Sequence, residues 1–112
     1  DIEEIETQIE DSIIKPHEKN HALGEEWGKI KPVFAVCSGG LQPGHFPTLV
    51  KYLGNDIILQ AGGGVHGHPN GTLKGAMAAR QAIDAIMNNM SLKQYAKNHK
   101  ELNLAVNKWN IR

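Results

Sequence analysis

Residues 57–71, IILQAGGGVHGHPNG, constrain the fold of this chain more than any other stretch. The apolar start is typical of a β-strand, the three consecutive glycines break that strand, and the sequence after residue 71 favours a helix. Glycines leave main-chain N–H groups open to a ligand, and the start of the following helix adds partial positive charge. The stretch therefore predicts a strand, a loop and a helix around an anion such as a phosphate.

A second unit of the same kind precedes the first. The run VFAVC at residues 33–37, between Pro32 and a Ser-Gly-Gly sequence, predicts a strand buried on both faces, as in parallel sheets. A helix over residues 44–53 should follow and end at Gly54-Asn55, and the second strand should cover residues 57–61. The apolar side of this helix contains Phe46, Leu49, Val50 and Leu53.

The chain after residue 71 reads as three helices. The first spans residues 72–89, the second extends from the capping residue Ser91 to Asn98, and the third covers residues 100–110. The expected apolar faces are Leu73, Ala76, Met77, Ile83, Ile86 and Met87 on the first helix, and Leu102, Leu104, Ala105, Val106 and Trp109 on the third.

The start of the chain is less informative. Isoleucines at spacings of three and four predict a helix over residues 1–11, followed by a loop that encloses a short helix over residues 16–27. His17 and His21 have the spacing of helical metal ligands, but no third ligand is evident nearby, so two solvated histidines is the favoured interpretation.

The alternation of strands and helices argues for parallel strands joined by right-handed crossovers. Ser38-Gly39-Gly40 and Gly62-Gly63-Gly64 would then lie side by side at the carboxyl edge of the sheet. Tight turns explain either loop alone, whereas the pair favours a phosphate or another anion. A sheet of two strands leaves edges and faces uncovered, so upstream sequence, a second copy or a partner chain should complete it.

Other site chemistries have weaker support. Residues 62–67 formally fit the dinucleotide pattern G-x-G-x-x-G, but the helix starts too late and the acid of a following strand is absent. His66 and His68 could serve a metal or act as a base, although packed turn histidines are commoner. Cys37 carries no pattern of a nucleophile, and a buried small residue is its default interpretation.

Composition excludes several classes of function. The 112 residues contain 12 Lys plus Arg and 12 Asp plus Glu, so there is no basic field for nucleic acid. No apolar run is long enough to span a membrane. The single cysteine cannot form an internal disulfide, which fits a reducing cytoplasmic setting.

At residues 31–109 the sequence resembles the large subunit of ribulose-1,5-bisphosphate carboxylase/oxygenase (RuBisCO), especially the archaeal kinds. The resemblance rests on SGG at residues 38–40 and QAGGG-x-x-GHP-x-G at residues 60–71, in this order and spacing. It implies an α/β fold that forms the carboxy-terminal part of a (β/α)8 TIM barrel, with its seventh and eighth strands and terminal helices. Residues 1–30 would then follow the mobile loop of the barrel, residues 31–90 form the two β-α units, and residues 91–112 form the terminal helices.

The resemblance also implies a substrate, ribulose-1,5-bisphosphate, which is carboxylated to 3-phosphoglycerate or oxygenated. Ser38 would hold the sugar backbone or its nearby phosphate, and the Gly62 and Gly63 amides the other phosphate, while His66 and His68 would be loop architecture. The substrate-binding residues implied in this way are Ser38, Gly39, Gly40, Gln60, Ala61, Gly62 and Gly63.

The resemblance places the catalytic lysines and the magnesium ligands outside this sequence. We therefore expect no catalytic or metal-binding residue here, no carboxylation by this chain alone, and partners in the rest of a large chain or in other large subunits of a homodimer-based oligomer. Residues 13–27 are longer than the family pattern, which suggests an assembly element, and Cys37 stands where alanine is usual. Two alternatives stay open: a RuBisCO-like enolase or isomerase acting on a related sugar phosphate, and a non-catalytic assembly fragment.

Overall fold

A computed structural model describes residues 13–14, 25–26, 28–29, 31 and 33–112 of the chain. The elements in chain order are β1 (Ile13–Ile14), β2 (Glu25–Glu26), β3 (Ala35–Cys37), the 3-10 helix η2 (Pro43–His45), α2 (Phe46–Leu53), β4 (Ile57–Leu59), α3 (Gly63–His66), α4 (Thr72–Met87), α5 (Leu92–Ala96) and α6 (Lys100–Lys108). The helix predicted over residues 1–11, and His17 and His21, lie outside the described residues.

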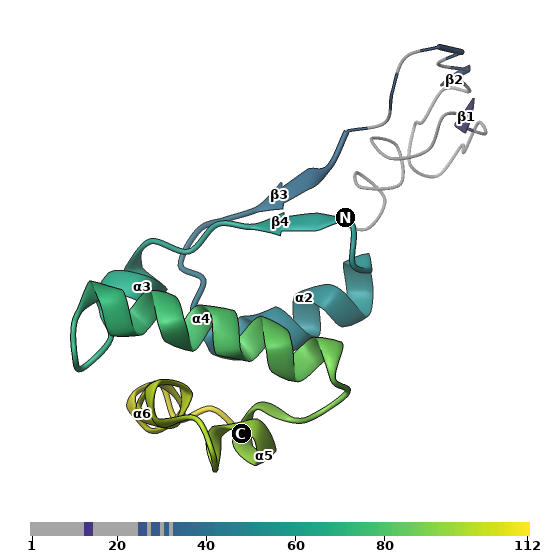
Figure 1. Cartoon of the computed structure of the whole chain (residues 1–112). Coiled ribbons are helices and arrows are strands. Elements are labelled where there is room, and N and C mark those ends of the chain that lie inside the picture. The colour runs from purple at the N-terminus through teal and green to yellow at the C-terminus, as the bar shows by residue number, and fades with distance from the viewer. Residues whose placement is uncertain (1–12, 15–24, 27, 30, 32) are drawn as a thin grey trace.

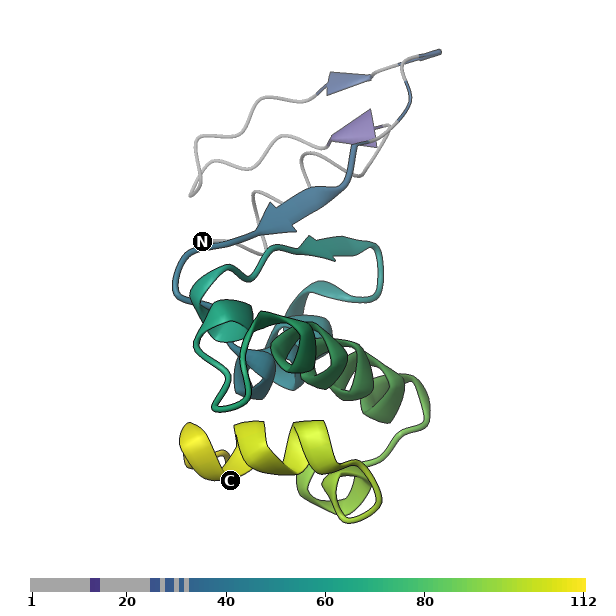
Figure 2. The same ribbon diagram turned by 60° about the vertical axis from the view of Figure 1, so that its left-hand side comes forward.

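From β3 onward the elements are stacked in layers (Figures 1 and 2). Strands β3 and β4 form one layer, α2 and α4 lie beneath them, and α5 and α6 cover the far side of α4. Helix α4 therefore lies at the centre and contacts α2, α3, α5 and α6.

The strand pair β3–β4 is parallel, as the sequence predicts, with Ala35 opposite Ile57 and Cys37 opposite Leu59. These residues are half-buried on the helix side. On the other face Val36 and Ile58, a direct pair, are 53% and 49% exposed. The prediction that the first strand is buried on both faces is therefore wrong for the described chain, because helices pack against only one face of the sheet.

The helix predicted over residues 44–53 is confirmed as η2 followed directly by α2, and side-chain caps hold the start of η2. The Gln42 Oε1 accepts a hydrogen bond from the Gly44 N–H at 2.6 Å, and the Gln42 N–H donates to His45 Nδ1 at 3.1 Å, which closes a capping box. Phe46, the first residue of α2, is buried, and α2 ends at Gly54 as expected.

Helix α4 spans the expected region, but it buries a different face from the one predicted. Its buried residues are Gly75, Ala78, Ala82 and Ala85. Leu73 is 73% exposed, and Ala76, Met77 and Met87 are exposed too, whereas Ile83 and Ile86 are partly buried against the core. Small side chains let the backbones of neighbouring helices come close, so proximity decides this face rather than side-chain hydrophobicity.

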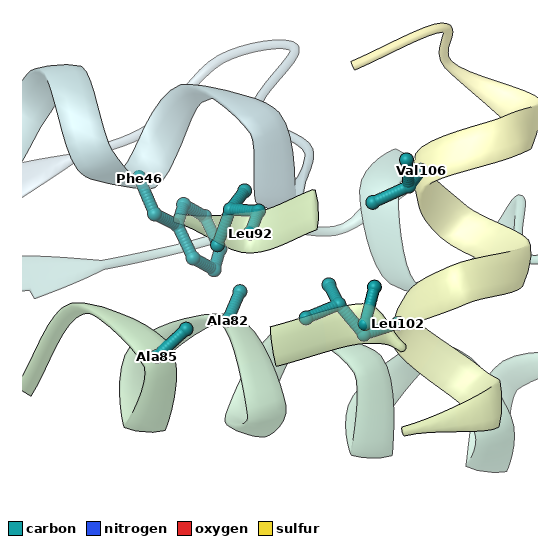
Figure 3. Packing of buried hydrophobic residues seen from close by; sticks show 7 residues of the cluster. Phe46, Ala82, Ala85, Leu92, Leu102 and Val106 are labelled. Atoms are coloured by element: carbon teal, nitrogen blue, oxygen red, sulfur yellow. The ribbon is translucent and has the colours of Figure 1, made fainter. Parts of the chain in front are cut away.

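The hydrophobic core joins α2, α4, α5 and α6. Figure 3 shows Phe46 and Leu92 beside Ala82 and Ala85 of α4, with Leu102 and Val106 of α6 close by. The terminal helices are confirmed: the Ser91 Oγ caps α5 by accepting the Gln94 N–H at 3.1 Å, and α6 buries Leu102, Ala105 and Val106. These four helices thus share one buried core, although Leu73, Met77 and Met87 of α4 stay exposed.

The helix predicted over residues 16–27 is wrong at its end, and the rest of that range lies outside the described residues. Glu25 and Glu26 form β2, which pairs antiparallel with Ile14 and Ile13 of β1. Pairing with β1 holds Glu25 and Glu26 in an extended conformation, so they cannot form hydrogen bonds within a helical turn.

Candidate functional site

The two glycine-rich segments begin side by side at the carboxyl edge of the β3–β4 pair. Cys37 and Leu59 are the last residues in register, and the Gln60 N–H donates to the Cys37 carbonyl at 2.9 Å. Ser38, which begins the first loop, therefore lies directly beside Gln60, which begins the second. The structure brings together the two segments that the sequence singles out.

The first loop presents open backbone. Ser38, Gly39 and Gly40 are all exposed, and a Cβ added at either glycine would meet no atom within 4 Å. The φ angles of +93° at Gly39 and +65° at Gly40 lie where L side chains are strained. The chain therefore turns here without covering its N–H groups or the Ser38 hydroxyl.

The second loop differs in part from its prediction. Gln60, Gly62 and Gly63 are exposed, and the two glycines have open space around them, but the side chain of Ala61 packs against the hydrophobic core. Ala61 can therefore offer a ligand only its main chain. In addition, the predicted glycine loop turns at once into the short helix α3, whose N-cap is Gly62, so the expectation that no helix begins before residue 72 is wrong.

The third glycine of this run has a different role from the first two. Gly64 is buried, and a Cβ there would overlap the Leu41 carbonyl oxygen and lie 2.9 Å from the Gln42 Cβ. Leu41 and Gln42 directly continue the Ser-Gly-Gly loop. Gly64 thus lets the two loops touch, while Gly62 and Gly63 leave their backbone free for a ligand.

The two histidines of the second loop do not converge on a shared site. His68 is only 4% exposed, and its Nδ1 accepts the Asn70 N–H at 3.1 Å. Its proton must therefore be on Nε2, which donates to the Glu101 carbonyl at 2.9 Å. His66 is exposed and lies 3.0 Å from the Thr72 hydroxyl through its Nδ1. Among the described residues, no group of three or more His, Cys, Asp or Glu side chains is placed to hold a metal ion.

A polar cluster on α4 and α6 was missed at the level of sequence. The Glu101 carboxylate accepts the Gln81 amide at 2.9 Å and the Lys74 ammonium at 3.2 Å, while the Gln81 Oε1 accepts the Leu102 N–H at 2.9 Å. The hydrogen bond from Gln81, then that from its own backbone, then Lys74, lower the pKa of the Glu101 carboxyl to about 2. The sequence offers one weak signal for it, an acid in the first turn of a helix.

Comparisons with known proteins agree with this geometry. Residues 3–109 match the family model of the ribulose bisphosphate carboxylase large chain, catalytic domain. The chain belongs to this family. The ribulose bisphosphate carboxylase of Methanosarcina barkeri is 52% identical over 92 residues, which are 82% of this chain and 22% of that protein.

Solved structures of relatives show which fold the chain has. The dimeric archaeal Rubisco of Hyperthermus butylicus superposes with a TM-score of 0.92 at 44% identity, over 99% of this chain and 26% of that one. A rubisco-like protein from Alicyclobacillus acidocaldarius superposes with a TM-score of 0.69 at 41% identity, over 73% of this chain and 21% of that one. The predicted fold class is confirmed: the chain is an α/β segment of a TIM barrel, and it spans about a quarter of the relatives it matches.

No helix in the described part of the chain is long and apolar enough to cross a membrane.

Proposed function

We propose that this chain acts as part of a ribulose bisphosphate carboxylase large chain, in its carboxy-terminal barrel region, where it binds the two phosphates of ribulose-1,5-bisphosphate. The observation that carries the proposal is the parallel register of β3 and β4, which brings two loops of open backbone to one edge of the sheet. The loops after the last two strands of a β/α barrel are a recurrent phosphate site. Membership of the family supports the choice of this substrate over other phosphates.

The residues divide into two groups by their position. Ser38, Gly39 and Gly40 hold the sugar backbone or its nearby phosphate through the hydroxyl and the N–H groups of the first loop. Gln60, the main chain of Ala61 and the amides of Gly62 and Gly63 hold the other phosphate. Because α3 has only four residues, its contribution is a set of directed N–H groups rather than a long helix dipole.

These groups bind and orient the substrate, and the proposal gives them no bond-breaking role. The described residues offer no cluster that fits the magnesium ion implied by the family resemblance. On the family resemblance, we assign the magnesium ligands and the enolising lysine to the remainder of the large chain, and we expect no incorporation of radioactive bicarbonate by this chain alone.

The exposed face of the strand pair supports the same assignment. Val36 and Ile58 present apolar side chains on the face that lacks helices, and Phe34, directly before β3, is 61% exposed. Burial of such a face in a barrel interior would remove it from water. We propose that the rest of the large chain covers this face. We also propose that large chains pair in a homodimer-based assembly, since the Hyperthermus butylicus relative is described as dimeric.

The test uses a hybrid large chain, in which this sequence replaces the matching segment of the Methanosarcina barkeri protein. Gly63→Asp puts a negative charge where a phosphate should bind, at a position with room for a side chain. A carboxylate beside a bound phosphate repels it by a few kcal/mol. KM for ribulose bisphosphate should therefore rise by at least about tenfold. The matched control is Asn55→Asp, which adds the same charge at the opposite end of β4. A Gly63→Asp hybrid with unchanged KM contradicts the proposal.

The rubisco-like neighbour supports a second candidate, an enolase or isomerase acting on a related sugar phosphate. A substrate with one phosphate would need one of the two loops, whereas the structure presents both with open backbone. Assay of the same hybrid with ribulose bisphosphate and with a sugar monophosphate separates the two. Turnover of the monophosphate without incorporation of bicarbonate favours the second candidate.

The third candidate is an assembly fragment without a substrate, which pairs through the uncovered strands with the rest of a large chain or with itself. The mass of the chain by size exclusion, with and without an upstream piece of the barrel, tests this candidate. A folded monomer that ignores the upstream piece counts against it.

A further inference from the structure

The turn that presents the Gly62 and Gly63 amides cannot hold its own shape. Helix α3 has four residues and no side-chain cap, and an isolated helix of this length is unstable in water. Its position must therefore come from its neighbours. Gly64 rests against Leu41, and Gly75 of α4 rests against the Val65 carbonyl, where an added Cβ would overlap.

One side chain ties the end of this turn to a distant helix. The Gly67 N–H donates to the Gly63 carbonyl at 2.9 Å, and the next residue is the buried His68. Its Nε2 donates to the Glu101 carbonyl at 2.9 Å, while its Nδ1 accepts the Asn70 N–H. The Nε2 bond reaches α6, 33 positions along the chain, whereas the Nδ1 bond stays within the turn.

The acceptor of the crossing bond is itself held in place. Gln81 of α4 donates to the Glu101 carboxylate and accepts the Leu102 N–H, and Lys74 forms a 3.2 Å ion pair with the same carboxylate. Contacts therefore run in a closed ring from α3 through His68 to α6, from α6 to α4, and from Gly75 of α4 back to α3. The Lys74 and Glu101 side chains are 41% and 16% exposed, so the ring is partly buried, and its paired polar groups restrict the segments that they join.

We propose that His68 is a positioning residue for the phosphate, and that its bond to the Glu101 carbonyl holds the Gly62 and Gly63 amides in their binding geometry. The inference rests on the proposed function of these amides. His68 does not touch the substrate, and its effect passes through the turn.

Two substitutions separate the crossing bond from the local one. The amide of asparagine lies as many bonds from Cβ as Nδ1 does, so His68→Asn keeps an acceptor for the Asn70 N–H and loses the bond to Glu101. The amide of glutamine matches Nε2, so His68→Gln keeps the donor to Glu101 and loses the local bond. Each variant loses one hydrogen bond, and the thermal midpoints of both should fall by similar amounts.

The readout is the split between KM and kcat in the hybrid large chain. His68→Asn should raise KM for ribulose bisphosphate roughly fivefold with little change in kcat, because one hydrogen bond no longer fixes the amides. His68→Gln should stay within about twofold of the parent hybrid, on the same reasoning. Equal increases in KM for the two variants would show that lost stability is the cause, and would overturn the proposal, as would an unchanged KM in a folded His68→Asn hybrid.

A second variant approaches the ring from its other side. Gln81→Leu removes both bonds by which this residue holds the first turn of α6, and it leaves residues 60–71 unchanged. KM should rise about threefold, and an unchanged KM in the folded variant overturns the proposal even if His68→Asn fails to fold. The control is Asn107→Ala, which removes an exposed bond to Asn103 on the same helix and should leave KM unchanged.

Gly63→Asp distinguishes failure of this inference from failure of the proposed function. If Gly63→Asp raises KM, but His68→Asn and Gln81→Leu both leave KM unchanged, the amides bind phosphate and His68 does not position them. If Gly63→Asp has no effect, the proposed function fails, and the inference fails with it.

Discussion

The two halves of the described chain differ in how far they bury their apolar side chains. Helices α4 to α6 enclose a core in which Ala82, Ala85 and Leu102 are fully buried. The strand pair β3–β4 has one uncovered apolar face and ends in loops of bare backbone. The exposed amides of Gly62 and Gly63 thus lie in the loops that follow the strand pair. Their geometry depends on contacts with the helical half. A binding backbone of this kind gains its rigidity from neighbours rather than from its own elements.

The largest expected difference between the halves is in stability. Leu102→Ala in α6 should lower the free energy of unfolding by about 2–5 kcal/mol, because it leaves a cavity in a closed core. Val36→Ala on the uncovered strand face should change it by less than about 0.5 kcal/mol in this chain. Urea unfolding followed by far-UV circular dichroism measures both. Equal losses would mean that the two halves do not differ as described.

Much of this organisation could be predicted from local signals. The Ser91 cap, the stop at Gly54 and the apolar runs of β3 and β4 each act within a few residues, so the sequence alone locates α2, α5 and the parallel strands. Parallel pairing in turn places both glycine loops at one edge. Whether the named residues bind phosphate stays a prediction.

What could not be predicted depends on contacts between distant residues. The buried face of α4 consists of Gly75 and alanines, which carry little hydrophobic signal, and it is chosen by the close approach of α3 and α6. The bond between His68 and Glu101 spans 33 positions, and no local pattern marks either residue as a partner of the other. The distinct role of Gly64 among three identical neighbours likewise exists only once Leu41 is in place.

The next largest effect separates neighbouring glycines. Gly64→Ala should lower the free energy of unfolding by about 1–3 kcal/mol, because its methyl group would overlap the Leu41 carbonyl oxygen and force the two loops apart. Gly62→Ala serves as the control, since its Cβ would meet no atom within 4 Å and its φ of −90° suits alanine. The same urea titration measures both variants. Similar losses for the two would remove the distinction between packing and ligand-facing glycines.

The smallest expected effect tests how the helical half is held, through the pKa of Glu101. This pKa is about 2 in the folded chain against an ordinary 4.5, with the bond from Gln81 as the largest cause. Because the folded pKa is the lower one, the ionised carboxylate stabilises the fold fully above about pH 4.5, and this contribution is lost as the pH falls toward about 2. The gap in urea midpoint between the parent chain and Glu101→Gln should therefore be constant from neutral pH to about 5 and close on further acidification. Asp84→Asn, which removes an exposed ion pair with Arg80, is the control and should show a smaller gap throughout. A gap for Glu101→Gln that persists unchanged near pH 2 would show that the carboxylate does not hold α6 against α4 by its charge.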